Sequence, residues 1–204
     1  MMPPALFIIA GPNGAGKSLF SSSLVEVDFE VFDGDKYIAE LKVKYPETGS
    51  DVLQTSVNEN QFYNAKELAI KTRGSFAFET NFSSDDPTQS LRQFKNAGYH
   101  CHLIFMGLNT IGECVQRVSM RVKAGGHKVP ESSIEYNYVQ GHKNLYTYYD
   151  HFDTVTLMDS SFPENEEIKV PEKILLWRNG RIKLFKTAFP KWVEKFIAVT
   201  QGQK

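Results

Sequence analysis

The stretch GPNGAGKS at residues 11–18 decides the fold, and the apolar run ALFIIA at residues 5–10 leads directly into it. A GxxxxGKS spacing between a short buried strand and a helix is that of a phosphate-binding loop. Its glycines turn backbone N–H groups inward around an anion, and the helix N-terminus adds partial positive charge. We therefore expect bound ATP or GTP. The expected contacts are Gly11, Pro12, Asn13, Gly14, Ala15, Gly16, Lys17 and Ser18.

Two side chains of this loop have separate expected roles. In such loops the lysine reaches the β- and γ-phosphates, and the hydroxyl that follows it binds Mg²⁺. These roles fall to Lys17 and Ser18. The alternative is a glycine-rich turn with a chance lysine, but the fixed positions and both flanks agree with the motif.

Length and composition place the chain among globular proteins. Its 204 residues, 41% of them hydrophobic, predict one kinase-like domain over residues 1–204, with a core at 5–161 and an appendage at 170–200. A net charge of -1 gives no overall attraction to nucleic acid or membrane, so neither is an expected partner. Residues 169–204 are basic, which indicates a solvated face or, alternatively, a docking surface. Cys101 and Cys114 have no partner at metal or redox spacing, so we expect a reducing cytoplasm.

Alternating strand and helix patterns predict an α/β fold, a three-layer P-loop NTPase with a mostly parallel central sheet. A C-terminal β-hairpin and helix follow, since Asn179-Gly180 separates two apolar runs. The expected strands are 5–10, 29–32, 75–78, 99–106 and 154–158, with hairpin strands at 174–177 and 182–185. The expected helices are 17–25, 37–44, 50–72, 87–97, 110–124 and 131–149, with a last helix after Pro190.

Carboxylates follow two of these strands, at the sheet edge where ligands of α/β proteins bind. Asp35, in the Asp33-Gly34-Asp35 turn, is the candidate catalytic base that deprotonates an acceptor hydroxyl. The alternative is that Asp35 only caps the next helix. Glu79, with Thr80 beside it, is a candidate for binding the acceptor or the Mg²⁺ shell, and a solvated strand end is its alternative.

Basic residues gather on and after the helix predicted at 110–124. Arg117 and Arg121 are four residues apart and share a helix face, while His127 and Lys128 follow the Gly125-Gly126 pair. Arginines from a lid stabilise the charge of a transferring phosphoryl group, so Arg117 and Arg121 are candidate catalytic residues. An ordinary charged helix surface is the alternative.

The motifs IIAGPNGAGKS, DGDKYIAEL, FAFETNFS, LRQFKNAGYH, RVSMRVKAGGHKVP and TLMDSS occur in order over residues 5–161. Together they resemble the zeta-toxin-like family of P-loop kinases. The resemblance implies Asp35 as general base, Glu79 on the acceptor, and Arg121 or Arg117 from the lid. A second arginine is expected before the proline, and His127 or Lys128 stands nearest as a substrate-binding residue. It also implies a hydroxyl acceptor such as a nucleotide sugar, and an antitoxin protein as a partner.

Two other functions are compatible with the same motifs. One is a nucleotide-dependent binding or regulatory ATPase module whose basic tail docks a partner. The other is a polynucleotide 5′-kinase, with residues 169–204 as its electrostatic track. Salt-sensitive binding of polynucleotides through residues 169–204 would favour the regulatory module.

Overall fold

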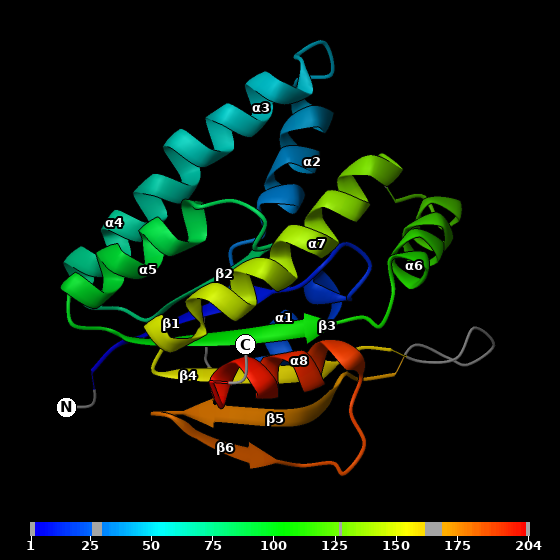
Figure 1. Cartoon of the computed structure of the whole chain (residues 1–204). Helices are drawn as coiled ribbons and strands as arrows, with labels where there is room; N and C mark the ends of the chain where they lie inside the picture. The colour runs from blue at the N-terminus through cyan, green and yellow to red at the C-terminus, as the bar shows by residue number, and fades with distance from the viewer. Residues whose placement is uncertain (1–2, 26–29, 127, 162–168, 203–204) are drawn as a thin grey trace.

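The computed structural model describes residues 3–25, 30–126, 128–161 and 169–202. Its centre is a six-stranded sheet in the order β2-β1-β3-β4-β5-β6 (Figure 1). The strands are β1 (Ala5–Ala10), β2 (Phe76–Thr80), β3 (His100–Gly107), β4 (Thr154–Asp159), β5 (Glu172–Arg178) and β6 (Arg181–Leu184). The first four are mutually parallel, and β5 and β6 add antiparallel at the β4 side. The predicted mostly parallel α/β fold is confirmed.

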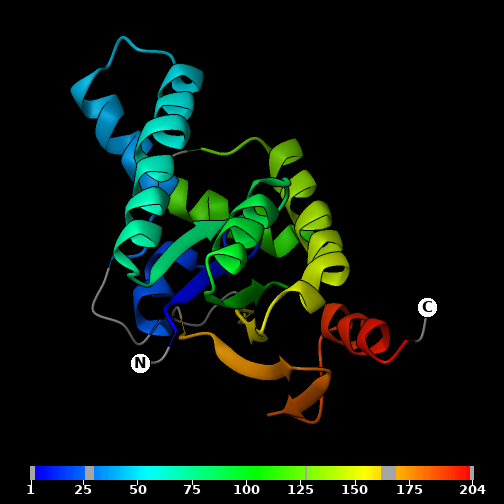
Figure 2. The same ribbon diagram turned by 90° about the vertical axis from the view of Figure 1, so that its left-hand side faces the viewer.

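Helices cover both faces of the sheet, which gives three layers (Figure 2). One face packs against α2, η1, α4, α5, α7 and α8 around Phe78, Leu103 and Phe105. The other packs against α1 and α6 around Ile9, Ile104 and Met106. The bounds are α1 Lys17–Leu24, α2 Gly34–Lys44, α3 Ser50–Ser56, π-helical η1 Val57–Phe62, α4 Tyr63–Thr72, α5 Asp86–Asn96, α6 Ile111–Lys123, α7 Glu131–Tyr148, 3₁₀-helical η2 Tyr149–His151 and α8 Lys191–Thr200. None of the helices in these ranges is long and apolar enough to cross a membrane.

The prediction of a strand at 29–32 is wrong for the part that the structure describes. Only Phe32 pairs, through a single parallel bridge to Phe78. Its N–H donates to the Ala77 carbonyl and its own carbonyl accepts from Glu79, both at 2.9 Å. The extended segment stops there because Asp33 caps α2, which therefore begins at Gly34 rather than at residue 37. Residues 26–29 lie outside the described ranges.

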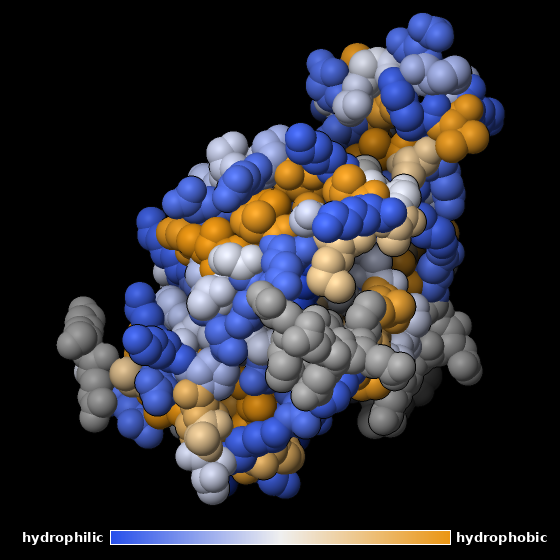
Figure 3. Space-filling view, turned by 90° about the vertical axis from the view of Figure 1, so that its right-hand side faces the viewer, coloured by the Kyte–Doolittle hydropathy of each residue, from blue (hydrophilic) through white to orange (hydrophobic). Residues whose placement is uncertain are grey.

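The helix predicted at 50–72 is present, with a π-helical turn in its middle. α3, η1 and α4 follow one another without a break. Of these, α3 projects from the body of the molecule together with α2, at the upper right of Figure 3. The π-turn inserts an extra residue into the helix and so changes which side chains face the sheet, an arrangement common at functional sites.

The C-terminal hairpin is part of the central sheet. β5 pairs along all of β4, with Leu157 opposite Leu175. α8 then returns over the sheet and buries Trp192, Val193 and Phe196. The indole of Trp192 lies against Gly107, where an added Cβ would be 2.2 Å from the ring. The hairpin and last helix therefore support the end of β3, next to the phosphate-binding loop.

Candidate functional site

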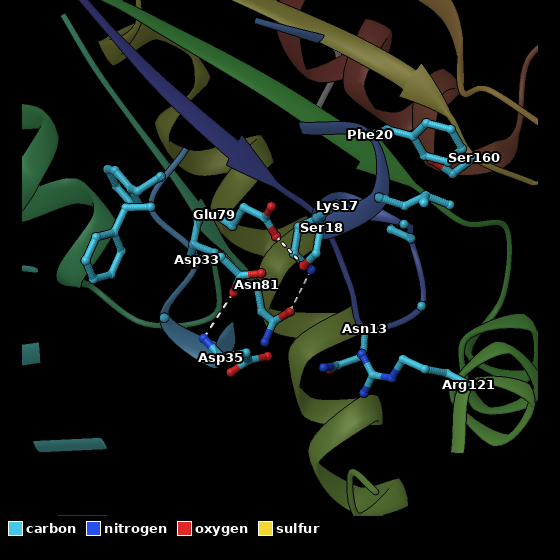
Figure 4. Close-up of a pocket in the computed structure, with 18 of the residues that line it drawn as sticks. Asn13, Lys17, Ser18, Phe20, Asp33, Asp35, Glu79, Asn81, Arg121 and Ser160 are labelled. Carbon is cyan, nitrogen blue, oxygen red and sulfur yellow. Dashed lines mark hydrogen bonds between the residues drawn. The ribbon is translucent and has the colours of Figure 1, made fainter. Parts of the chain in front are cut away.

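A cavity of about 820 Å³ lies at the carboxyl ends of β1 and β2 (Figure 4). The phosphate-binding loop forms its floor, and α2, η1, α5 and α6 supply its walls. It is lined by Asn13–Phe20, Phe32–Asp35, Gln54, Asn58, Phe62, Phe78–Asn81, Ser84, Asp86, Pro87, Arg117, Met120, Arg121, Ala124, Ser160, Lys169 and Pro171. Candidate residues from four separate segments thus share one space.

The loop keeps its shape because its glycines adopt angles that other residues avoid. Gly11 and Gly14 have φ values of 148° and 83°. A Cβ on Gly11 would be 2.2 Å from the Met106 carbonyl, and one on Gly14 would be 3.1 Å from the Cβ of Arg117. The loop is therefore held closely between β3 and α6.

Lys17 is half-buried and lines the cavity, where its ammonium group is held by three acceptors. It donates to the carbonyls of Gly11 at 2.8 Å and Pro12 at 3.2 Å, and to Asn81 Oδ1 at 3.0 Å. Burial lowers the pKa of Lys17, an effect that the nearby Glu79, Asp35 and Asp33 carboxylates oppose. A desolvated cation of this kind interacts strongly with a phosphate that enters the site.

Glu79 connects β2 to the phosphate-binding loop. Its Oε2 accepts from Ser18 Oγ at 2.8 Å, and its Oε1 accepts from Ser21 Oγ at 2.7 Å. Burial raises the pKa of Glu79, and the two hydroxyl donors partly offset this. Both oxygens of Glu79 thus face the serine hydroxyls at the start of α1. Thr80 also lines the cavity, while its Oγ1 accepts from the Phe82 N–H at 2.9 Å.

The two aspartates of the Asp-Gly-Asp turn differ in their surroundings. Asp33 Oδ1 accepts from the backbone N–H groups of Asp35 at 3.0 Å and Lys36 at 3.3 Å, so Asp33 is the cap of α2. Asp35 lies in the first turn of α2, with an exposed side chain at the cavity. Among the described residues its carboxylate accepts no hydrogen bond, so capping does not occupy it.

Both arginines of α6 reach the cavity. Arg117 is half-buried, burial lowers its pKa, and its Nη1 lies 3.5 Å from the Gly14 carbonyl. Arg121 lines the outer part of the cavity, and its side chain passes close to Gly126. Lys128 is exposed and is not among the cavity-lining residues, and His127 lies outside the described ranges. The structure therefore brings Arg117 and Arg121 to the loop, but not Lys128.

One face of α7 holds the residues after β2 in place. Asn137 donates to Asn13 Oδ1 at 2.8 Å and accepts from Ser83 Oγ at 2.6 Å. Asn144 donates to the Phe82 carbonyl at 2.9 Å, where Phe82 has an unusual φ of 57°. The sequence prediction did not include these two asparagines. Their spacing places them on one face of the helix, and this was the sequence pattern that could have pointed to them. They fix the position of Asn81 and hence its contact with Lys17.

Gly141 lies on the same face of α7, and its replacement provides a test of this contact. A Cβ there would be 2.6 Å from the Asn81 carbonyl, so Gly141→Ala must displace the segment that contacts Lys17. We expect a loss of about 1–3 kcal/mol in unfolding free energy and at least a roughly tenfold loss of turnover. Denaturant titration and rate measurements check both. Gly112→Ala on α6, whose new Cβ meets only ordinary contacts, should be neutral or slightly stabilising, and a neutral Gly141→Ala would contradict the account.

The GxxxxGKS loop thus lies beside carboxylates at the end of β2 and at the start of α2. A family profile described as Zeta toxin matches residues 2–180. The chain belongs to the zeta toxin family. This match includes β5 and so extends beyond the resemblance recognised in residues 5–161. An uncharacterized protein of Haemophilus influenzae is 28% identical over 139 residues, or 68% of this zeta toxin family chain and 94% of that protein.

Solved structures confirm that this zeta toxin family member has a P-loop kinase fold. A crystal structure of AvrRxo1-ORF1:-ORF2 with ATP matches with a TM-score of 0.64 at 13% sequence identity. The match includes 97% of this chain but only 63% of the AvrRxo1 chain, so this chain is the shorter of the two. A putative kinase from Chloroflexus aurantiacus has a TM-score of 0.60 at 17% sequence identity, and the match covers 82% of this chain and 91% of that kinase. The structure from the PezAT toxin–antitoxin system of Streptococcus pneumoniae has a TM-score of 0.56 at 13% sequence identity, and the match covers 100% of this chain and 86% of that chain.

Proposed function

We propose that this protein transfers the γ-phosphate of ATP or GTP to a hydroxyl group of a small acceptor. The observation that carries the proposal is the convergence of Lys17, Glu79 and Asp35 on one cavity. Lys17 and the loop amides would hold the phosphates. Asp35, exposed at the same cavity and not engaged in capping, would face the acceptor.

The transfer follows from these positions. Asp35 accepts the proton of the acceptor hydroxyl, whose oxygen forms a new bond to the γ-phosphorus. The bond from the γ-phosphorus to the bridging oxygen breaks, and the nucleoside diphosphate leaves with that electron pair. Lys17, Arg117 and Arg121 stabilise the negative charge on the phosphoryl oxygens.

The residues around Ser18 fit a magnesium ion. The Ser18 hydroxyl and the Glu79 carboxylate are hard oxygen ligands within 2.8 Å of each other. A hydroxyl and a carboxylate are oxygen donors of the kind that Mg²⁺ takes, beside water and substrate phosphates. When bound, the ion neutralises phosphate charge.

Glu79→Gln tests the magnesium assignment. The amide keeps the size of the side chain but loses its charge, so we expect the KM for Mg²⁺ at saturating ATP to rise about 10- to 100-fold. Because burial raises the pKa of Glu79, the wild-type Mg²⁺ affinity should begin to fall on acidification at a pH above the ordinary carboxyl value of 4.5. Ser21→Ala removes one hydrogen bond but no charge and should change this KM less. An unchanged KM in Glu79→Gln would remove Glu79 from the metal shell.

A protein partner of the antitoxin type is part of the proposal. Its support is the fold shared with the toxin–antitoxin system from Streptococcus pneumoniae and with the two-component AvrRxo1 complex. A partner that covers the cavity would block nucleotide or acceptor entry.

A metabolite extract tests the proposed reaction. The protein is incubated with the extract, Mg²⁺ and ATP or GTP labelled in the γ-phosphate, beside the Lys17→Ala variant. A labelled small molecule formed only by the wild type supports the proposal. Label on nucleic-acid ends would indicate a polynucleotide 5′-kinase instead, and release of free phosphate alone would indicate a regulatory ATPase.

A further inference from the structure

The ammonium group of Lys17 uses all three of its hydrogen-bond donors within the protein. An ammonium group donates three hydrogen bonds and accepts none. Its three acceptors are the carbonyls of Gly11 and Pro12 and the Oδ1 atom of Asn81, at distances of 2.8, 3.2 and 3.0 Å. A phosphate oxygen that binds Lys17 must therefore displace at least one of these acceptors.

Asn81 is the acceptor on the side from which a phosphate enters. Of the three residues that hold the ammonium group, only Asn81 lines the cavity, whereas Gly11 and Pro12 are buried and do not line it. A backbone carbonyl in such a loop also cannot move away alone. The side chain of Asn81 is half-buried at the cavity, so after release its amide can bond to water or to a ligand.

The backbone of Asn81 is held in place, but its side chain is held by Lys17 alone. Gly141 of α7 lies so close that an added Cβ would be 2.6 Å from the Asn81 carbonyl. The next residue, Phe82, is fully buried, and its carbonyl accepts from Asn144 at 2.9 Å. Among the described residues the amide of Asn81 makes one hydrogen bond, the one to Lys17. Its side chain can therefore leave Lys17 by rotation, without movement of the segment.

We propose that Asn81 is a positioning residue that holds Lys17 in the nucleotide-free site and releases it to a phosphate oxygen. The inference rests on the nucleotide-binding part of the proposed function. Asn81 Oδ1 competes with the nucleotide for one donor of the ammonium group, and so lowers the nucleotide affinity of the empty site. Figure 4 shows Asn81 between Lys17 and Asp35, so rotation away from Lys17 turns the amide toward the carboxylate that faces the acceptor.

The nucleotide affinity of Asn81→Ala tests this competition. Alanine removes the competing acceptor, so the Kd for a non-hydrolysable ATP analogue with Mg²⁺, measured by calorimetry, should fall about 3- to 10-fold. Asn81→Asp keeps the acceptor and adds a negative charge, so its Kd should rise about tenfold or more. An unchanged or higher Kd in Asn81→Ala would overturn the proposal. If the wild type did not bind the analogue, the proposed function itself would be contradicted instead.

A double substitution shows whether Asn81 acts through Lys17. In the Lys17→Ala background there is no ammonium group to hold, so the further change Asn81→Ala should alter the Kd of the analogue by less than about twofold. A fall of the same size in both backgrounds would show that Asn81 acts on the nucleotide in another way, and would overturn the proposal. Because the side chain is half-buried and makes this one hydrogen bond, the variants should fold, and their melting temperatures check this.

Discussion

Replacement of Lys17 by alanine should abolish phosphoryl transfer, with a rate loss of about 10³-fold or more. The ammonium group is buried against the loop carbonyls and Asn81, so it is already desolvated before the phosphates arrive. Its removal deletes the cation next to the transferring group, and water cannot replace a charge fixed in a desolvated site. The initial rate of label transfer from γ-labelled ATP measures the effect.

Folding of the variant must be checked separately. Burial lowers the pKa of Lys17, which means that burial disfavours its charged form when no nucleotide is bound. We therefore expect the Lys17→Ala variant to have a melting temperature close to that of the wild type. A variant that melts normally and still transfers phosphate at a tenth of the wild-type rate or faster would contradict the role given to Lys17.

The second large effect is expected for Asp35→Asn. Loss of the general base should lower kcat by about 10²- to 10⁴-fold. Nucleotide affinity should stay within about threefold, because the carboxylate is exposed and accepts no hydrogen bond in the described part of the chain. Single-turnover rates and the Kd of a non-hydrolysable nucleotide separate these two quantities.

Asp33→Asn is the matched control for Asp35→Asn. Asparagine caps helices as well as aspartate does, so α2 should keep its start while one neighbouring negative charge is lost. We expect less than a tenfold loss of kcat. If Asp33→Asn lost as much as Asp35→Asn, the general field of the carboxylates rather than a specific base would explain the result.

The phosphate-binding loop and the parallel strands around it could be predicted from sequence because their signals are local. Eight consecutive residues define the loop, and the apolar runs of β1 and β3 stand out against polar neighbours. Glu79 could be placed at the site since the carboxyl ends of parallel strands share one edge of the sheet. The register of β1 with β2 determines where Glu79 lies along this edge, and there its carboxylate accepts hydrogen bonds from Ser18 and Ser21.

Long-range packing accounts for what could not be predicted. The contacts of Asn137 and Asn144 join residues more than 50 positions apart, so no local pattern of α7 identifies their partners. The hairpin was expected within an appendage at 170–200, and its pairing with β4 depends on the sheet edge that the other strands leave open. Of the strand expected at 29–32, the described residues 30–32 form one bridge, because the cap at Asp33 competes with further pairing.

The fate of the γ-phosphorus tests the central claim most directly. Phosphorus NMR of the wild-type protein with ATP, Mg²⁺ and the metabolite extract follows all phosphate species in one sample. The account predicts that a phosphate monoester signal grows as the γ-phosphate signal declines, and that Lys17→Ala shows neither change. Growth of the inorganic phosphate signal alone, at the rate of ATP loss, would contradict it.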